Sequence, residues 1–120
     1  TGAQPLPANV GLTGSKAYYV SAKLKDWNEP KPYEFNSYVI RVVSFADLSS
    51  LPQNAIVKLI YRMPDHPTMG IEEVIAERQV DGSFFANLEY SMSGAWEIKV
   101  KIMIGDLNDE VVFNVDVKGL

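Results

Sequence analysis

Hydrophobic and polar residues alternate along most of this chain. Residues 95–104 carry a large apolar side chain at every second position from Trp96 onward, with mostly charged residues between them. Residues 110–117 repeat the pattern, with three valines and Phe113 on one face. A period of two predicts β-strands that bury one face and expose the other to water. Five further segments rich in Val, Ile, Tyr and Phe are also predicted as strands: residues 17–25, 34–45, 55–63, 71–80 and 84–90.

Turn signals separate these segments. Asp81-Gly82 predicts a tight hairpin turn, and residues 105–109 predict a longer hairpin loop. Residues 45–54 have room for one helical turn before Pro52 ends it. Residues 71–80 also contain good helix formers, and we predict a strand there because the segment runs directly into the Asp81-Gly82 turn.

About seven strands with a turn every ten residues or so predict an all-β protein, an antiparallel sandwich of two sheets. A closed barrel is the competing architecture. Residues 1–16 are rich in Pro and Gly and are predicted to be a flexible leader, so the single sandwich domain is expected to span residues 17–120. Such a leader is typical of a protein that is exported or tethered to a membrane.

Composition excludes several classes of function. The net charge of −4 argues against a nucleic-acid-binding protein, which would show a basic patch. The absence of cysteine excludes disulfides, thiolate metal sites and thiol catalysis. No run of apolar residues is long enough for a transmembrane segment.

Catalytic motifs are also missing. Residues 11–16 read GLTGSK, which has the wrong order and glycine spacing for a phosphate-binding loop. Glu72 and Glu73 are neighbours on a predicted strand, so they point to opposite faces and cannot act as a carboxylate pair. With one histidine and no G-x-S-x-G motif, the chain is predicted not to be an enzyme.

One loop combines soft metal ligands. Residues 63–70 read MPDHPTMG and contain Met63, His66 and Met69, held between two prolines that exclude a helix. We expect these three side chains to project from a stiff loop at one end of the sandwich. Thioethers together with an imidazole suit Cu(I) better than Zn(II), Mg(II) or Ca(II). Methionines also fill gaps at strand ends, so a loop without a metal is the alternative.

A second turn adds a further methionine. Met92 and Gly94 precede the strand that begins near Trp96, and Gly94 can take a positive φ in such a turn. If this turn lies at the same end of the sandwich as residues 63–70, Met92 becomes a fourth soft ligand. Met92 can equally pack into the core beside Trp96, which we predict to be a core residue.

These motifs carry a resemblance to a known family. In order they read Met-Pro-x-His-x-x-Met-Gly, Asp-Gly-x-Phe and Leu-x-Tyr-x-Met-x-Gly-x-Trp-x-Ile-x-Val, within about residues 35–117. This pattern resembles the YtkA-like family and the related FixH-like periplasmic domains. The resemblance implies a small immunoglobulin-like β-sandwich, extracytoplasmic and often tethered, that works beside copper handling and cytochrome-oxidase assembly. It also implies that Met63, His66, Met69 and Met92 bind Cu(I).

Two kinds of function follow as expectations. The first is a periplasmic module that binds copper or delivers it to an acceptor protein. The second is an interaction or assembly module for a membrane complex, without a metal, using exposed residues such as Tyr18, Tyr19 or the pair Phe84 and Phe85. An accessory domain of a larger protein is a third reading. Tyr18 and Tyr19 are predicted to face opposite sides of their strand, so only one is free for a partner.

Overall fold

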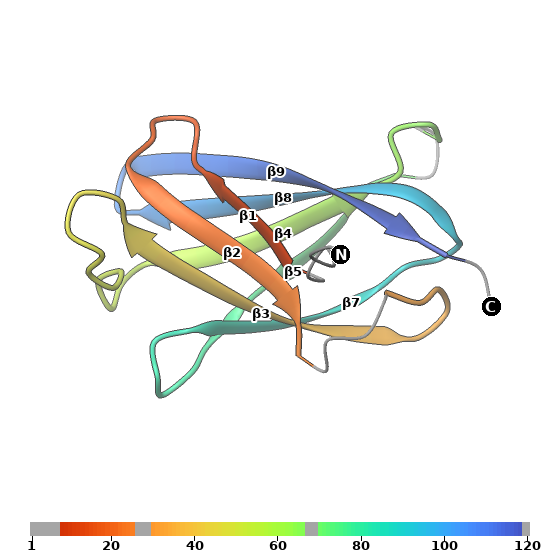
Figure 1. Cartoon of the computed structure of the whole chain (residues 1–120), viewed down its shortest axis with the longest axis horizontal. Helices are drawn as coiled ribbons and strands as arrows, with labels where there is room; N and C mark the ends of the chain where they lie inside the picture. The colour runs from red at the N-terminus through yellow and green to blue at the C-terminus, as the bar shows by residue number, and fades with distance from the viewer. Residues whose placement is uncertain (1–7, 26–29, 67–69, 119–120) are drawn as a thin grey trace, which may run out of the picture.

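Nine β-strands in two sheets form the regular structure of residues 8–25, 30–66 and 70–118, which the computed structural model describes (Figure 1). Sheet A has the strand order β1-β2-β3-β7-β6, and sheet B has the order β5-β4-β8-β9. None of the described residues forms a helix that could span a bilayer. The strands are β1 (Ala8–Leu12), β2 (Tyr18–Leu24), β3 (Phe35–Ser44), β4 (Ile56–Arg62), β5 (Glu72–Ile75), β6 (Glu77–Arg78), β7 (Phe84–Glu89), β8 (Gly94–Ile104) and β9 (Leu107–Val117).

The two sheets pack face to face as an immunoglobulin-like sandwich. Strands β2-β3-β7-β6 lie opposite β5-β4-β8-β9, and every neighbouring pair is antiparallel. This is the order A-B-E-D against C′-C-F-G of immunoglobulin-like domains. In Figure 1, β2 crosses in front of β8 and β4, so the outer face of sheet A is turned toward the viewer. The predicted all-β antiparallel sandwich is confirmed, with nine strands where about seven were expected.

One extra strand comes from the segment 71–80, which divides at Ala76. Residues Glu72–Ile75 pair with β4 in sheet B, whereas Glu77 and Arg78 pair with β7 in sheet A. Ala76 is buried between them, and its N–H donates to the carbonyl of Val57 at 2.8 Å. The chain therefore crosses from one sheet to the other at Ala76.

The other extra strand, β1, corrects the predicted leader. Residues 8–12 pair along β2, and a side chain at Gly11 would touch the Phe113 ring and Val111 at 3.4 Å. The turn that follows is held by Asp109, which accepts hydrogen bonds from the N–H and hydroxyl of Ser15. Residues 8–16 thus belong to the domain, and the prediction of a flexible leader is wrong for them. Residues 1–7 lie outside the described residues.

Aromatic side chains fill the core between the sheets. Trp96 is 3% exposed, as expected of a core residue, and its ring centroid lies 5.1 Å from that of Tyr90 and 6.0 Å from that of Tyr61. The hydroxyls of Tyr90 and Tyr38 are 2.6 Å apart and form a hydrogen bond across β3 and β7. Each buried phenol therefore has a polar partner, as a buried hydroxyl requires.

Arg78 of β6 ties the β3–β4 loop to sheet A at one end of the sandwich. Its guanidinium donates to the carbonyls of Leu51 and Pro52, both at 2.7 Å, and lies 5.4 Å from the centroid of the Phe84 ring. We expect Arg78→Met to lower the free energy of unfolding by about 2 kcal/mol, because two charged hydrogen bonds are lost while the volume is kept. Urea unfolding measures the difference.

Arg62→Met is the matched control for Arg78→Met. Arg62 makes an exposed ion pair with Glu97 at 3.3 Å, and we expect its loss to cost less than about 1 kcal/mol. If the two variants lose the same free energy, Arg78 has no special role in holding the β3–β4 loop.

Candidate soft-metal site

Met63 lies in the core and does not project from its loop. It directly follows β4, and the alternation of that strand turns its side chain inward with Tyr61 and Leu59. Its side chain is only 3% exposed. The prediction that Met63 projects from the loop with His66 is therefore wrong, because the strand alternation continues one residue beyond the last strand hydrogen bond.

The loop after Met63 turns sharply outward. Pro64 and Asp65 are exposed, and the N–H of His66 donates to the carbonyl of Met63 at 3.0 Å. This hydrogen bond closes a turn that leaves the His66 side chain on the surface. Met69, the third residue of the predicted loop site, lies outside the described residues.

Gly94 is the point where the Met63 loop meets the second methionine turn. A Cβ atom built on Gly94 would lie 2.5 Å from the methyl carbon of Met63, so the thioether end of Met63 packs directly on the Gly94 backbone. Gly94 has a φ of +132°, which side chains rarely adopt. Both the space and the backbone conformation thus require glycine, and this glycine stands two residues after Met92.

Met92 lies at the same end of the sandwich as Met63. Its side chain is half-buried against the core, and its carbonyl accepts a hydrogen bond from the Trp96 indole N–H at 3.0 Å. This hydrogen bond therefore ties the turn of residues 90–93 to Trp96 in the aromatic core. We call this region, formed by residues 63–66 and 90–94, the Met63 end. The structure thus places Met63 and the turn that contains Met92 at the same end of the sandwich.

Methionine sulfur atoms are the main potential metal ligands at the Met63 end. Across the described residues, no group of three or more His, Cys, Asp or Glu side chains is placed to hold a metal ion. A site at the Met63 end therefore depends on thioethers, with His66 as its nitrogen donor. Such a donor set fits a soft monovalent ion.

Of the aromatic residues expected to contact a protein partner, some lie in the core and others on the surface. Tyr18 packs partly against the core and Tyr19 is 40% exposed, which confirms that they face opposite sides of β2. Phe84 is buried, so it is not available to a partner. Phe85 is half-buried on the outer face of sheet A.

Comparisons with known proteins do not assign the chain to a family. No family model, no curated protein and no solved structure matches it.

Proposed function

We propose that this domain binds Cu(I) at the Met63 end and acts outside the cytoplasm as a copper-carrying or copper-delivering module of YtkA-like type. The observation that carries the proposal is the contact at Gly94, where the Met63 methyl group meets the turn that holds Met92. Two thioethers from segments almost thirty residues apart thereby reach the same end of the sandwich. His66, and Met69 outside the described residues, complete the proposed ligand set.

The surroundings of the thioethers favour a soft, weakly hydrated ion. Met63 is buried and Met92 half-buried, so water competes poorly for an ion held between them. Neutral sulfur ligands carry no charge that an apolar environment would penalise, in contrast to carboxylates. The exposed His66 imidazole supplies a ligand at the surface, from which an acceptor protein can take the ion.

A Cu(I) titration under anaerobic conditions, in competition with bicinchoninate, tests the proposal. We expect Met63→Leu and Met92→Leu each to weaken Cu(I) binding at least tenfold, because leucine keeps the apolar volume but has no sulfur. We expect a smaller loss for His66→Ala and Met69→Leu. Circular dichroism establishes that each variant retains the sheet structure.

Met103→Leu is the matched control, since it changes the remaining methionine of the chain on the outer face of β8. Its affinity for Cu(I) should equal that of the wild type. Equal affinities in all five variants and the wild type would remove the basis for the copper proposal.

An interaction module for a membrane complex is the second candidate. The observation that favours it is a shallow groove on the outer face of sheet A, which is lined by Lys23, Lys25 and Arg41 among other residues.

A further inference from the structure

We propose that the outer face of sheet A binds an extended acidic segment of a partner protein. The surface in question is a shallow groove of about 530 Å³ across β2, β3 and the β6–β7 turn. We call it the sheet A groove. Its lining residues are Lys23, Lys25, Val39, Arg41, Gln79, Val80, Asp81, Ser83 and Phe85.

The strand register assembles the groove from distant parts of the chain. Lys23 pairs with Val39 on β3, and Val39 pairs with Phe85 on β7, so these three residues form one row across the sheet. Arg41 lies two residues further along β3, on the same outward face. Lys25 lies two residues beyond Lys23, and its ammonium group is 5.8 Å from the centroid of the Phe85 ring.

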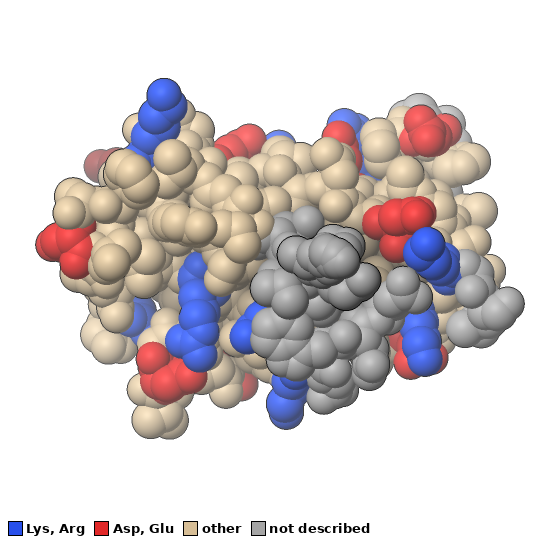
Figure 2. Space-filling view, viewed as in Figure 1, with Lys and Arg blue, Asp and Glu red and all other residues tan. Residues whose placement is uncertain are grey.

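The groove is cationic although the chain as a whole is acidic. Three cations and one carboxylate line it, whereas the whole chain carries a net charge of −4. Figure 2 shows Lys and Arg side chains on this face, with Asp and Glu side chains among them. Opposite charges on two surfaces steer association and select the partner. The charge of the groove therefore selects an acidic partner.

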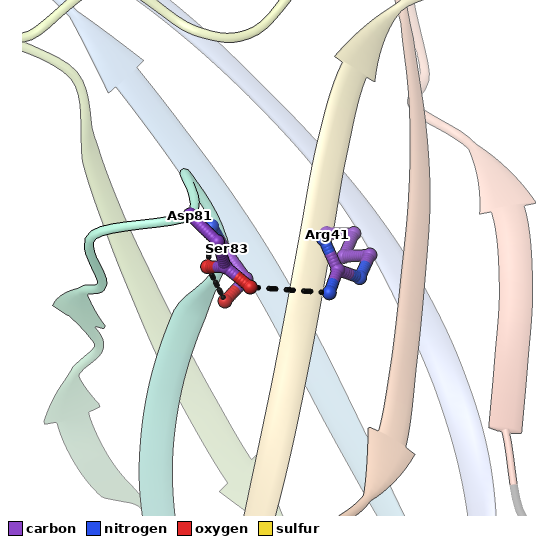
Figure 3. A network of polar contacts seen from close by, with 3 residues as sticks. All are labelled: Arg41, Asp81 and Ser83. Carbon is purple, nitrogen blue, oxygen red and sulfur yellow. Dashed lines mark hydrogen bonds and ion pairs between the residues drawn. The ribbon is translucent and has the colours of Figure 1, made fainter.

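Asp81 holds Arg41 in place at the rim of the groove. The N–H and hydroxyl of Ser83 donate to one Asp81 oxygen at 2.9 and 2.6 Å, and Arg41 donates to the other at 3.3 Å (Figure 3). Hydrogen bonds from Ser83 lower the pKa of Asp81 and keep it ionised. A guanidinium has five N–H donors, so Arg41 can bind a second carboxylate while it remains paired with Asp81.

The geometry matches an extended chain better than a compact ligand. Same-face side chains along a strand, such as Val39 and Arg41, are about 7 Å apart, and an extended peptide repeats its alternate side chains at the same distance. Carboxylates along one face of such a peptide can thus reach Arg41 and Lys25 together. Val39 and Phe85 form an apolar floor of the groove, and the fully exposed Val80 lies at its rim. These side chains can contact an apolar residue of the peptide that stands between its carboxylates.

A peptide titration followed by backbone amide chemical shifts tests this proposal. The probe is an eight-residue peptide with glutamate at alternate positions and one tyrosine, measured at low salt. We expect the shifted amides to lie in β2, β3 and β7. The double variant Lys25→Gln/Arg41→Gln should bind the peptide at least tenfold more weakly than the wild type.

The double variant Lys99→Gln/Lys101→Gln is the matched control. It removes the same charge from the outer face of sheet B and also breaks one exposed ion pair, that of Lys99 with Glu110. Its affinity should stay within twofold of the wild type, and a loss equal to that of the groove variant would overturn the proposal.

Two further probes separate specific recognition from simple charge attraction. A peptide of the same composition with its glutamates adjacent should bind several-fold more weakly, and equal binding would overturn the extended geometry. Vesicles containing one third phosphatidylserine should bind no more tightly than vesicles of phosphatidylcholine alone. Vesicle binding that requires Lys25 and Arg41, without peptide binding, would assign the groove to lipid headgroups and overturn the protein partner.

Discussion

Replacing Gly94 by valine should lower the free energy of unfolding by about 4 kcal/mol. A β-branched side chain at a φ of +132° costs about 2 kcal/mol in backbone strain. Its Cβ would also lie 2.5 Å from the methyl group of Met63, and overpacking of a filled core costs about 1–3 kcal/mol. Met63 is flexible but buried, so it has little room to withdraw. Urea unfolding followed by tryptophan fluorescence measures the loss, since Trp96 lies next to this turn.

Gly105→Val separates the strain from the packing. Gly105 also has a positive φ, +59°, but no atom lies within 4 Å of the position that its Cβ would take. We expect that variant to lose only about 1–2 kcal/mol, from strain alone. Met63→Ala should cost less stability in the Gly94→Val background than in the wild type, and as much in the Gly105→Val background as in the wild type. Additive losses in both double variants would contradict the contact between Met63 and Gly94.

The domain should lose stability steeply as the pH rises from about 10 to about 12. Burial raises the pKa of Tyr38 to about 12, although its hydrogen bond with Tyr90 partly opposes this, and burial also raises the pKa of Tyr90. Both phenols are thus held neutral in the folded state, whereas in the unfolded chain they ionise near pH 10. Their contribution is complete below pH 10 and is lost above it. For Tyr38 alone, the loss by pH 12 is on the order of 2 kcal/mol.

Phenylalanine substitutions identify the two hydroxyls as the source of this pH dependence. Tyr38→Phe/Tyr90→Phe should reduce the alkaline loss, leaving the smaller part due to Tyr61, whose pKa is also raised by burial. At neutral pH this double variant should be more stable than Tyr90→Phe alone, which leaves the Tyr38 hydroxyl buried without its partner. Tyr19→Phe, on the exposed face of β2, is the control. An unchanged alkaline slope in the double variant would contradict the role of the pair.

The two proposed activities occupy separate surfaces, so each can fail without the other. The Met63 end lies where β4 and β7 finish, whereas the sheet A groove spans the outer face of β2 and β3 and reaches the β6–β7 turn. Substitution of Met92 should leave peptide binding unchanged, and substitution of Lys25 and Arg41 should leave Cu(I) binding unchanged. A domain with both activities would hold a partner with one surface while it passes copper from the other.

The strands and their two faces were predictable from sequence because alternation is a local property. A period of two over ten residues leaves few choices of buried face, and Trp96, Tyr18 and Tyr19 take the sides that their positions predict. The sandwich follows from the number of such segments and from the turns between them. The sequence also indicated that Met63 and Met92 lie at turns, since each stands beside a predicted turn.

Only the tertiary structure decided which distant residues meet. Strand β1 became part of the domain through its pairing with β2, and the segment 71–80 divides at Ala76, where the chain crosses between the sheets. Strand alternation turns Met63 inward, but only the fold places its methyl group against Gly94 of the distant second turn. The sheet A groove depends on the register of β2, β3 and β7, and no spacing along the chain specifies register. Alternation states which face of a strand is buried, whereas the neighbours on that face are set by pairing between segments far apart in sequence.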